Sequence, residues 1–234
     1  MSQVKVGIIG AMDSEVALLK AKMEGARVRS VAGMELCEGM LAGVPAVVVK
    51  CGVGKVNAAV CAQTLTCIEG CTHVINTGVA GSLDMRIEIG DIVVSTEAVE
   101  HDMDVTPLGY APGEHPDEHI VAFEADPALR RAAVAAAREV GGVQVFEGRV
   151  CSGDQFIGSA AAKQRIIDTF GGLCCEMEGA AIAHVCHLAD VPFVVVRAIS
   201  DKADDSGDVS YAEFEKDAAA RCASIVLAAL PAIA

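Results

Sequence analysis

The sequence contains no tryptophan, and aromatic residues make up only 3% of its 234 residues. Small aliphatic residues dominate instead, so helices can pack closely on a sheet while each side chain buries little area. A protein built in this way gains stability from association between subunits. Its apolar content of 53% is consistent with a buried subunit interface.

Long apolar runs and an excess of basic residues are also missing. No apolar run approaches the roughly 20 residues that span a bilayer, and the N-terminus lacks the pattern of a signal peptide. The formal net charge of −14 argues against nucleic acids and anionic membranes as partners, because both attract patches of Lys and Arg. The sequence therefore predicts a cytoplasmic protein that binds a neutral or cationic small molecule.

Metal-ligand spacings are absent as well. The cysteine spacings do not fit a zinc knuckle, and without an export signal ten cysteines indicate reduced thiols that fill the core. His184 and His187 share one helical face, and His115 and His119 lie in one loop, but neither pair has an evident third ligand. We therefore predict no metal and no cofactor.

No internal repeat or low-complexity spacer divides the chain, so we expect a single domain over residues 1–234. Apolar strand-like runs alternate with helix-like segments, which is typical of an α/β fold with a central, mixed, twisted sheet flanked by helices. Strands are predicted at 4–10, 46–49, 73–76, 91–95, 143–151 and 193–196, a hairpin at 27–43, helices at 56–68, 127–140, 159–170, 180–188 and 211–230, and loops at 77–81, 99–116 and 202–209.

Three carboxylates stand where predicted strands and helices meet. Glu15 lies in the helical turn after the first strand, Glu178 opens a helix, and Asp201 closes the next strand. Ligands of α/β sheets bind at the carboxyl ends of strands, so we expect these acids to face one pocket. Glu178 could instead be an ordinary acid at the start of a helix, and Asp201 could cap the next turn. A buried acid also needs a partner, and Arg197 is expected to pair with Glu178.

The glycine-rich turns do not form a known phosphate loop. Gly7 and Gly10 lack the third glycine of the dinucleotide fingerprint, and the turn at 52–55 lacks the Walker spacing. Acids at the start of the first helix would also repel phosphate. Gly78 and Gly81 follow another predicted strand and allow the backbone to approach a ligand closely, so they form a second candidate wall of the pocket.

A pocket with three acids in different surroundings fits the cleavage of a purine N-glycosidic bond. That reaction needs a base that activates the nucleophile, a group that holds the sugar hydroxyls, and a proton for the departing purine. We assign these roles to Glu15, Glu178 and Asp201 respectively. Phe156, on a loop at a strand end, either stacks on the base or plugs the core.

Short motifs spread over nearly the whole chain carry a family resemblance: GIIGAM at 7–12, NTG at 76–78, GDIVVS at 90–95, HD at 101–102, SGD at 152–154, EME at 176–178 and VVVRAISD at 194–201. Together they closely resemble the methylthioadenosine/S-adenosylhomocysteine nucleosidases of the nucleoside phosphorylase superfamily. The joint EME and RAISD matches are specific, whereas the glycine turns alone are not. The resemblance implies a hydrolase in methionine salvage and amino-acid biosynthesis that acts on methylthioadenosine, S-adenosylhomocysteine and 5′-deoxyadenosine.

The resemblance also implies a role for each site residue. It makes Glu15 the acid that activates water, Glu178 the ribose-binding acid and Asp201 the acid that protonates purine N7. Pro116 matches a position that reaches in from the neighbouring subunit, which implies a homodimer. By the same resemblance, Ser200 orients Asp201, and Arg197 supports Glu178 and the water. Phe156 stacks on adenine, the backbone of Ile157 reads the edge of the base, and Met177 lines the sugar site. The pocket for the 5′-thio group is formed by Met12, Val53, Val105, Leu108, Tyr110 and Tyr211.

Several positions depart from the family pattern. Val79 stands where a serine near the water is common, and Leu108 and Tyr211 stand where phenylalanine is common. These departures leave a futalosine-type substrate open. A purine nucleoside phosphorylase would need arginines around its phosphate, which the first loop and the segment 78–81 lack. A protein without catalytic activity that binds a nucleoside is a further alternative. Binding alone, however, would not require a general base positioned to activate water.

Overall fold

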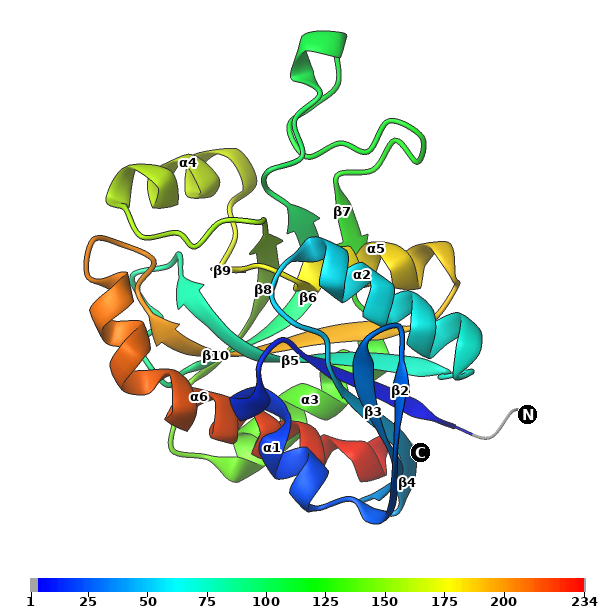
Figure 1. Ribbon diagram of the computed structural model, residues 1–234. Coiled ribbons are helices and arrows are strands. Elements are labelled where there is room, and N and C mark those ends of the chain that lie inside the picture. The colour runs from blue at the N-terminus through cyan, green and yellow to red at the C-terminus, as the bar shows by residue number, and fades with distance from the viewer. Residues whose placement is uncertain (1–3, 234) are drawn as a thin grey trace.

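A mixed β-sheet runs through the centre of the molecule, and helices cover both of its faces (Figure 1). The computed structural model describes residues 4–233. The strands are β1 (Val6–Gly10), β2 (Glu24–Val31), β3 (Met34–Leu41), β4 (Val44–Lys50), β5 (His73–Ser82), β6 (Ile92–Glu100), β7 (Ala122–Glu124), β8 (Val145–Ser152), β9 (Cys174–Glu176) and β10 (Phe193–Asp201). The α-helices are α1 (Asp13–Ala21), α2 (Lys55–Gln63), α3 (Pro127–Val140), α4 (Ala160–Phe170), α5 (Gly179–Leu188) and α6 (Gly207–Ala229).

Five of the strands close into a ring. β10 pairs in parallel with β5 and antiparallel with β6, β6 pairs in parallel with β8, and the short β9 joins β8 to the end of β5. β1 pairs in parallel with the first half of β5, and β4, β3 and β2 continue the sheet beyond it. Because β1, β5 and β10 all run in parallel, their carboxyl ends meet at one edge of the sheet.

Two apolar layers hold the helices on the sheet. α1, α3 and α6 pack on one face, and α2 and α5 pack on the other (Figure 1). Every residue of β1 and β10 is buried, which explains their nearly continuous apolar sequences. Small side chains such as Ala219 and Ala223 let α6 lie close to the strands. The polar residues at the carboxyl end of β10 are therefore buried as well.

The predicted fold class, an α/β domain with a mixed sheet flanked by helices, is confirmed, whereas several element bounds differ. The segment 77–81, predicted as a loop, belongs to β5, because β10 and β9 pair with it. β7 and β9, of three residues each, are not predicted. α6 begins at Gly207, inside the loop predicted at 202–209. The predicted domain ends at 1 and 234 lie outside the described residues. Within residues 4–233, no helix is long and apolar enough to cross a bilayer.

Candidate active site

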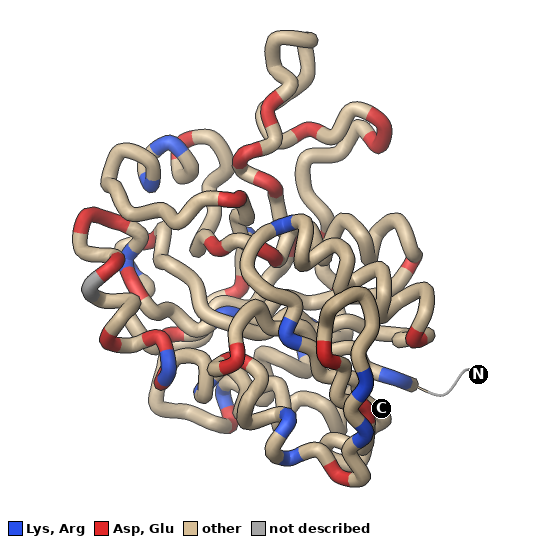
Figure 2. Tube along the Cα trace, viewed as in Figure 1, with Lys and Arg blue, Asp and Glu red and all other residues tan. Residues whose placement is uncertain are grey.

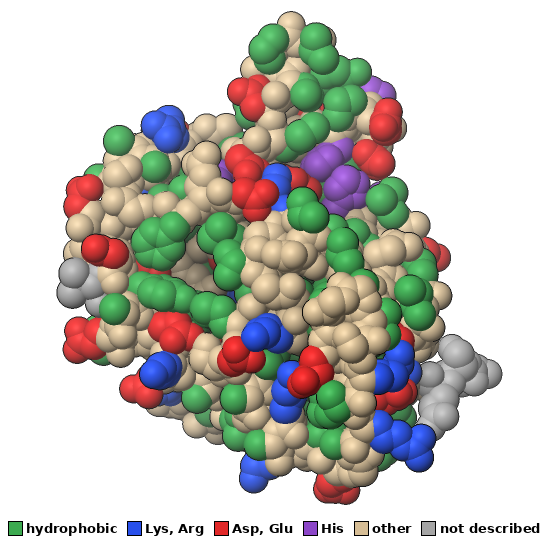
Figure 3. Space-filling view, in the orientation of Figure 1, with side chains coloured by type: hydrophobic (Ala, Val, Ile, Leu, Met, Phe, Trp, Pro, Cys, Tyr) green, Lys and Arg blue, Asp and Glu red, His purple; other side chains and the backbone are tan. Residues whose placement is uncertain are grey.

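A cavity of about 230 Å³ opens where the carboxyl ends of β1, β5 and β10 meet. Figure 3 shows this face of the molecule hollowed and bordered by hydrophobic side chains. All three predicted acids, Glu15, Glu178 and Asp201, line the cavity. It is also lined by other residues that the sequence predicts for the site: Met12, Val53, Gly81, Phe156, Met177, Ser200 and Tyr211.

Three backbone N–H groups fix the carboxylate of Glu15. Oε2 accepts from Ala11 at 2.6 Å and from Met12 at 3.0 Å, and Oε1 accepts from Val79 at 3.0 Å. The residue is only 2% exposed, and burial raises the pKa of this carboxyl, although Arg197 and the three N–H groups oppose the rise. Since a backbone N–H of β5 is one of these donors, Val79 orients Glu15 without a side-chain hydroxyl.

Glu178 precedes the first residue of α5, and its two oxygens have different surroundings. Oε1 accepts a hydrogen bond from the N–H of Gly54 at 2.8 Å. Oε2 lies 3.8 Å from Arg197 Nη2, which is too long for a hydrogen bond. Burial and then the neighbouring Glu176 carboxylate raise the pKa of Glu178. Oε2 therefore keeps the capacity to accept a hydrogen bond from a ligand hydroxyl.

Asp201 ends β10 and is oriented by two hydrogen bonds. Oδ2 accepts from the hydroxyl of Ser200 at 3.0 Å, and Oδ1 accepts from the N–H of Ala203 at 2.8 Å. Burial raises the pKa of the carboxyl. A Cβ at Gly81 would lie 2.6 Å from Oδ1, so only glycine lets β5 pass this close.

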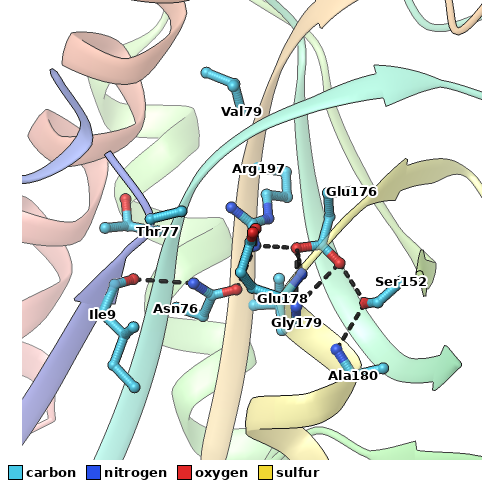
Figure 4. Close-up of polar contacts among 12 residues, drawn as sticks. Ile9, Asn76, Thr77, Val79, Ser152, Glu176, Glu178, Gly179, Ala180 and Arg197 are labelled. Atoms are coloured by element: carbon cyan, nitrogen blue, oxygen red, sulfur yellow. Dashed lines mark hydrogen bonds and ion pairs between the residues drawn. The ribbon is translucent and has the colours of Figure 1, made fainter. Parts of the chain in front are cut away.

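Arg197 pairs most closely with Glu176, which the sequence analysis does not predict, and forms a longer ion pair of 3.8 Å with the predicted partner Glu178 (Figure 4). Nη2 donates to Glu176 Oε2 and to Oδ1 of Asn76, whose side-chain amide donates in turn to the carbonyl of Ile9 at 2.9 Å. The guanidinium is fully buried. It hydrogen-bonds to the acid that ends β9 inside the ring, whereas Glu178 lies farther away because it follows the strand at the start of α5.

Glu176 collects several further hydrogen bonds. The hydroxyl of Ser152 donates to it, as do the N–H groups of Glu178 and Gly179 at 2.8–3.1 Å. The N–H of Ala180 donates to the Ser152 oxygen at 2.7 Å. This carboxylate thereby satisfies N–H groups at the start of α5, where the helix dipole favours an anion. The sequence analysis gives Glu176 and Ser152 no role, although a buried arginine signals that such a carboxylate must exist.

The backbone of Gly78 lies between Arg197 and Glu15. A Cβ at this position would overlap both Nη1 of Arg197 and Oε1 of Glu15. Nε and Nη1 of Arg197 are buried and have no hydrogen-bond partner among residues 4–233. Glycine is therefore required at this position. Its small size allows Nη1 of the buried Arg197 to lie close to the buried carboxylate of Glu15.

Some predicted residues lie outside this cavity. Ile157 lines a smaller adjoining cavity together with Phe156 and Asp201. The loop between β6 and β7 projects from the body of the molecule (Figure 1) and carries four more: Val105, Leu108, Tyr110 and Pro116. The structure does not bring these four to the cavity of their own chain, because the loop extends outward and Leu108 is 75% exposed.

The sequence and the fold match known proteins. A sequence model described as the phosphorylase superfamily matches residues 5–231. The chain belongs to this superfamily. It is 42% identical to the 5′-methylthioadenosine/S-adenosylhomocysteine nucleosidase of Shewanella sediminis, over 97% of this chain and 99% of the relative.

Solved structures agree with this relationship. The nucleosidase of the same name from Neisseria meningitidis, in complex with methylthio-immucillin-A, superposes with a TM-score of 0.93 at 41% identity, covering 97% of this chain and 98% of the other. Futalosine hydrolase of Helicobacter pylori superposes with a TM-score of 0.92 at 30% identity, covering 97% of each chain. The resemblance and the assignment to the N-glycosyl hydrolases, both predicted from the sequence, are confirmed.

Replacing Glu176 with glutamine removes the charge that compensates Arg197. Because breaking a buried ion pair leaves an unpaired charge in the core, we expect Glu176→Gln to lower the free energy of unfolding by about 3 kcal/mol. Urea denaturation followed by circular dichroism measures the change. Glu97→Gln is the matched control, since Glu97 pairs with Arg149 at 2.9 Å on a partly exposed surface, and its expected cost is below about 1 kcal/mol. Equal costs would contradict the structural role of Glu176.

Proposed function

We propose that this protein hydrolyses the N-glycosidic bond of methylthioadenosine and S-adenosylhomocysteine, and also of 5′-deoxyadenosine, to adenine and the 5′-substituted ribose. The observation that carries the proposal is the convergence of Glu15, Glu178 and Asp201 on one cavity from three separate elements. Burial raises the pKa of each of these carboxyls. Relatives named as nucleosidases for 5′-methylthioadenosine and S-adenosylhomocysteine support this choice of substrate.

Activation of the water is assigned to Glu15, supported by Arg197. Next to Gly78, the guanidinium of Arg197 lies close to the carboxylate of Glu15 and favours its ionised form. A water in the cavity that donates to Glu15 would keep a lone pair for attack on the anomeric carbon. The N–H of Val79 holds Glu15 in the orientation this step needs.

The other groups of the cavity are assigned to the sugar and the base. Glu178 and Met177 would hold the ribose, and Asp201 would protonate purine N7 as the bond breaks, because a raised pKa favours a carboxylic acid that can donate. Phe156 is 52% exposed and meets Tyr211 edge-on, with ring centroids 5.8 Å apart. An exposed ring at the cavity supports stacking on adenine over a role in the core. The backbone of Ile157 would read the edge of the base.

Water is favoured over phosphate as the nucleophile. None of the described residues that line the cavity is Lys or Arg, and Arg197 already pairs with Glu176. A phosphate ion would therefore meet the carboxylates without a cation to balance it. A futalosine-type nucleoside is the second candidate substrate, since futalosine hydrolase of Helicobacter pylori has nearly the same fold.

A homodimer is part of the proposal. The projecting loop would present Pro116, with Val105 and Tyr110, to the cavity of a second copy of this chain. Val56 and Val60, one turn apart on α2, are 74% and 43% exposed, and Val53 at the cavity is 51% exposed. Covering these apolar side chains would stabilise such a dimer. A single catalytic domain over 1–234, a cytoplasmic location and a role in methionine salvage and amino-acid biosynthesis stay predictions.

Release of free adenine tests the proposed function. Purified protein is incubated with methylthioadenosine, S-adenosylhomocysteine, 5′-deoxyadenosine, inosine and futalosine, each with and without phosphate. We expect adenine from the first three nucleosides at the same rate in both conditions. Base release only in the presence of phosphate would identify a phosphorylase, and cleavage of futalosine alone would select the second candidate. No base release from any nucleoside would leave only a binding function.

Asp201→Asn should abolish most turnover while leaving binding largely intact. Loss of a positioned general acid typically costs about 10²–10⁴-fold, and asparagine keeps the shape of the side chain. Single-turnover rates and the Kd for methylthioadenosine separate the two effects. Asp204→Asn is the matched control, because Asp204 bonds to Ser206 outside the cavity. A near-normal rate in Asp201→Asn would remove Asp201 from the proton-donor role.

The pH dependence of kcat/KM should report the buried base. Glu15 acts only when ionised, and burial raises its pKa above the ordinary glutamate range. Activity should therefore be lost as pH falls through this raised pKa, before ordinary carboxylates titrate. Initial rates across the acid range give the midpoint, and circular dichroism at each pH checks that the protein stays folded. A folded enzyme whose activity persists down to the ordinary glutamate pKa would contradict the assignment.

A further inference from the structure

Two histidines and a glutamate meet at the base of the projecting loop, outside the cavity. Glu100 ends β6, His115 lies in the loop and His184 lies on α5. One ligand atom from each lies within 4.8 Å of the other two. Figure 3 shows histidine side chains gathered beneath this loop, next to acidic and basic side chains. We propose that these three residues form a binding site for a divalent transition-metal ion of the zinc class.

The distances suit such an ion. Glu100 Oε1 lies 3.8 Å from His115 Nε2 and 3.6 Å from His184 Nδ1. Ligands about 2.0–2.1 Å from a tetrahedral zinc stand roughly 3.4 Å apart, so small side-chain rotations bring all three into place. Two imidazoles and one carboxylate also form a common ligand set of open zinc and iron sites. A fourth position would remain for water.

Two buried histidine nitrogens of the cluster make no hydrogen bond within the described residues. Nε2 of His115 and Nε2 of His184 are buried and accept or donate no hydrogen bond within residues 4–233. His115 is only 7% exposed, and its backbone is fixed by hydrogen bonds to Ile120 and His119. Buried polar atoms normally have a partner, so His115 Nε2, which faces Glu100, signals a missing ligand.

The neighbouring groups would orient the metal ligands. Lys55 Nζ donates to Glu100 Oε2 at 2.7 Å, which leaves Oε1 directed at the two imidazoles. The ring of His184 stacks on Phe123 with centroids 4.6 Å apart. Its Nε2 lies 3.9 Å from Glu118 Oε1, within reach of the carboxylate–histidine–metal arrangement that fixes a ligating tautomer.

The local charge favours a cation. Residues 101–121 include five acids and no Lys or Arg, and Figure 2 shows the projecting loop marked by acidic positions alone. Lys55 is the cation that contacts the cluster, and it is shared between Glu100 and Asp102. A divalent ion would offset the remaining negative charge and tie the loop to β6 and α5. Its role would be to hold the loop in place rather than to activate the substrate.

Calorimetric titration of tag-free, chelator-treated protein with Zn²⁺ tests the proposal. We expect one ion per chain and a rise in melting temperature on binding. Removing outer-shell partners of a metal already costs about 10–100-fold in affinity, so His115→Ala and Glu100→Gln should each weaken binding by at least about 100-fold. His187→Ala is the matched control, because His187 lies on the same helix but is exposed and outside the cluster.

Three results would overturn the site. These are the absence of saturable Zn²⁺ binding, unchanged affinity in His115→Ala and Glu100→Gln, and an equal loss in His187→Ala. Binding of Co²⁺ to the unmodified protein provides a readout independent of the variants, since histidine ligation changes its visible absorption. A Co²⁺ spectrum identical to that of the hydrated ion would show that the histidines instead only pair with Glu100.

Discussion

One buried ion pair, between Arg197 and Glu176, joins the elements that form the cavity. Arg197 comes from β10 and Glu176 from β9, while Asn76 of β5 and Ser152 of β8 bond to the same two groups. Since a buried guanidinium is costly without its counter-charge, Glu176 stabilises the closed ring of strands. The same carboxylate accepts from the first N–H groups of α5, and so fixes the point from which Glu178 enters the cavity.

The sequence predicts those strands that can be recognised from the apolar pattern of their own residues. β1 and β10 are buried on both faces and therefore appear as continuous apolar runs. β7 and β9 give no such pattern, because longer neighbouring strands supply the pairing edges on which they form. For the same reason β5 continues through Gly78 to Ser82, although glycines in this segment favour a loop when only local sequence is considered.

The sequence predicts which acids belong to the site better than it predicts their partners. Strand ends and helix starts are recognisable, so Glu15, Glu178 and Asp201 stand out. Glu176 and Glu178 are two residues apart, and the sequence does not reveal that the chain leaves β9 between them. The histidines follow the same rule: neither sequence pair finds its third ligand locally, because Glu100 comes from a distant strand. Local sequence patterns therefore do not predict contacts between segments that are distant in the chain.

The base of the projecting loop and the cavity are linked by two consecutive residues. Lys55 joins Glu100 to Asp102 through its ammonium group, and the N–H of Gly54 donates to Glu178 Oε1. Gly54 has a φ of 97°, which glycine adopts without strain. Lys55 contacts the acids at the base of the loop, and the preceding residue, Gly54, holds the carboxylate assigned to the ribose. One short segment therefore contacts both the base of the loop and the cavity.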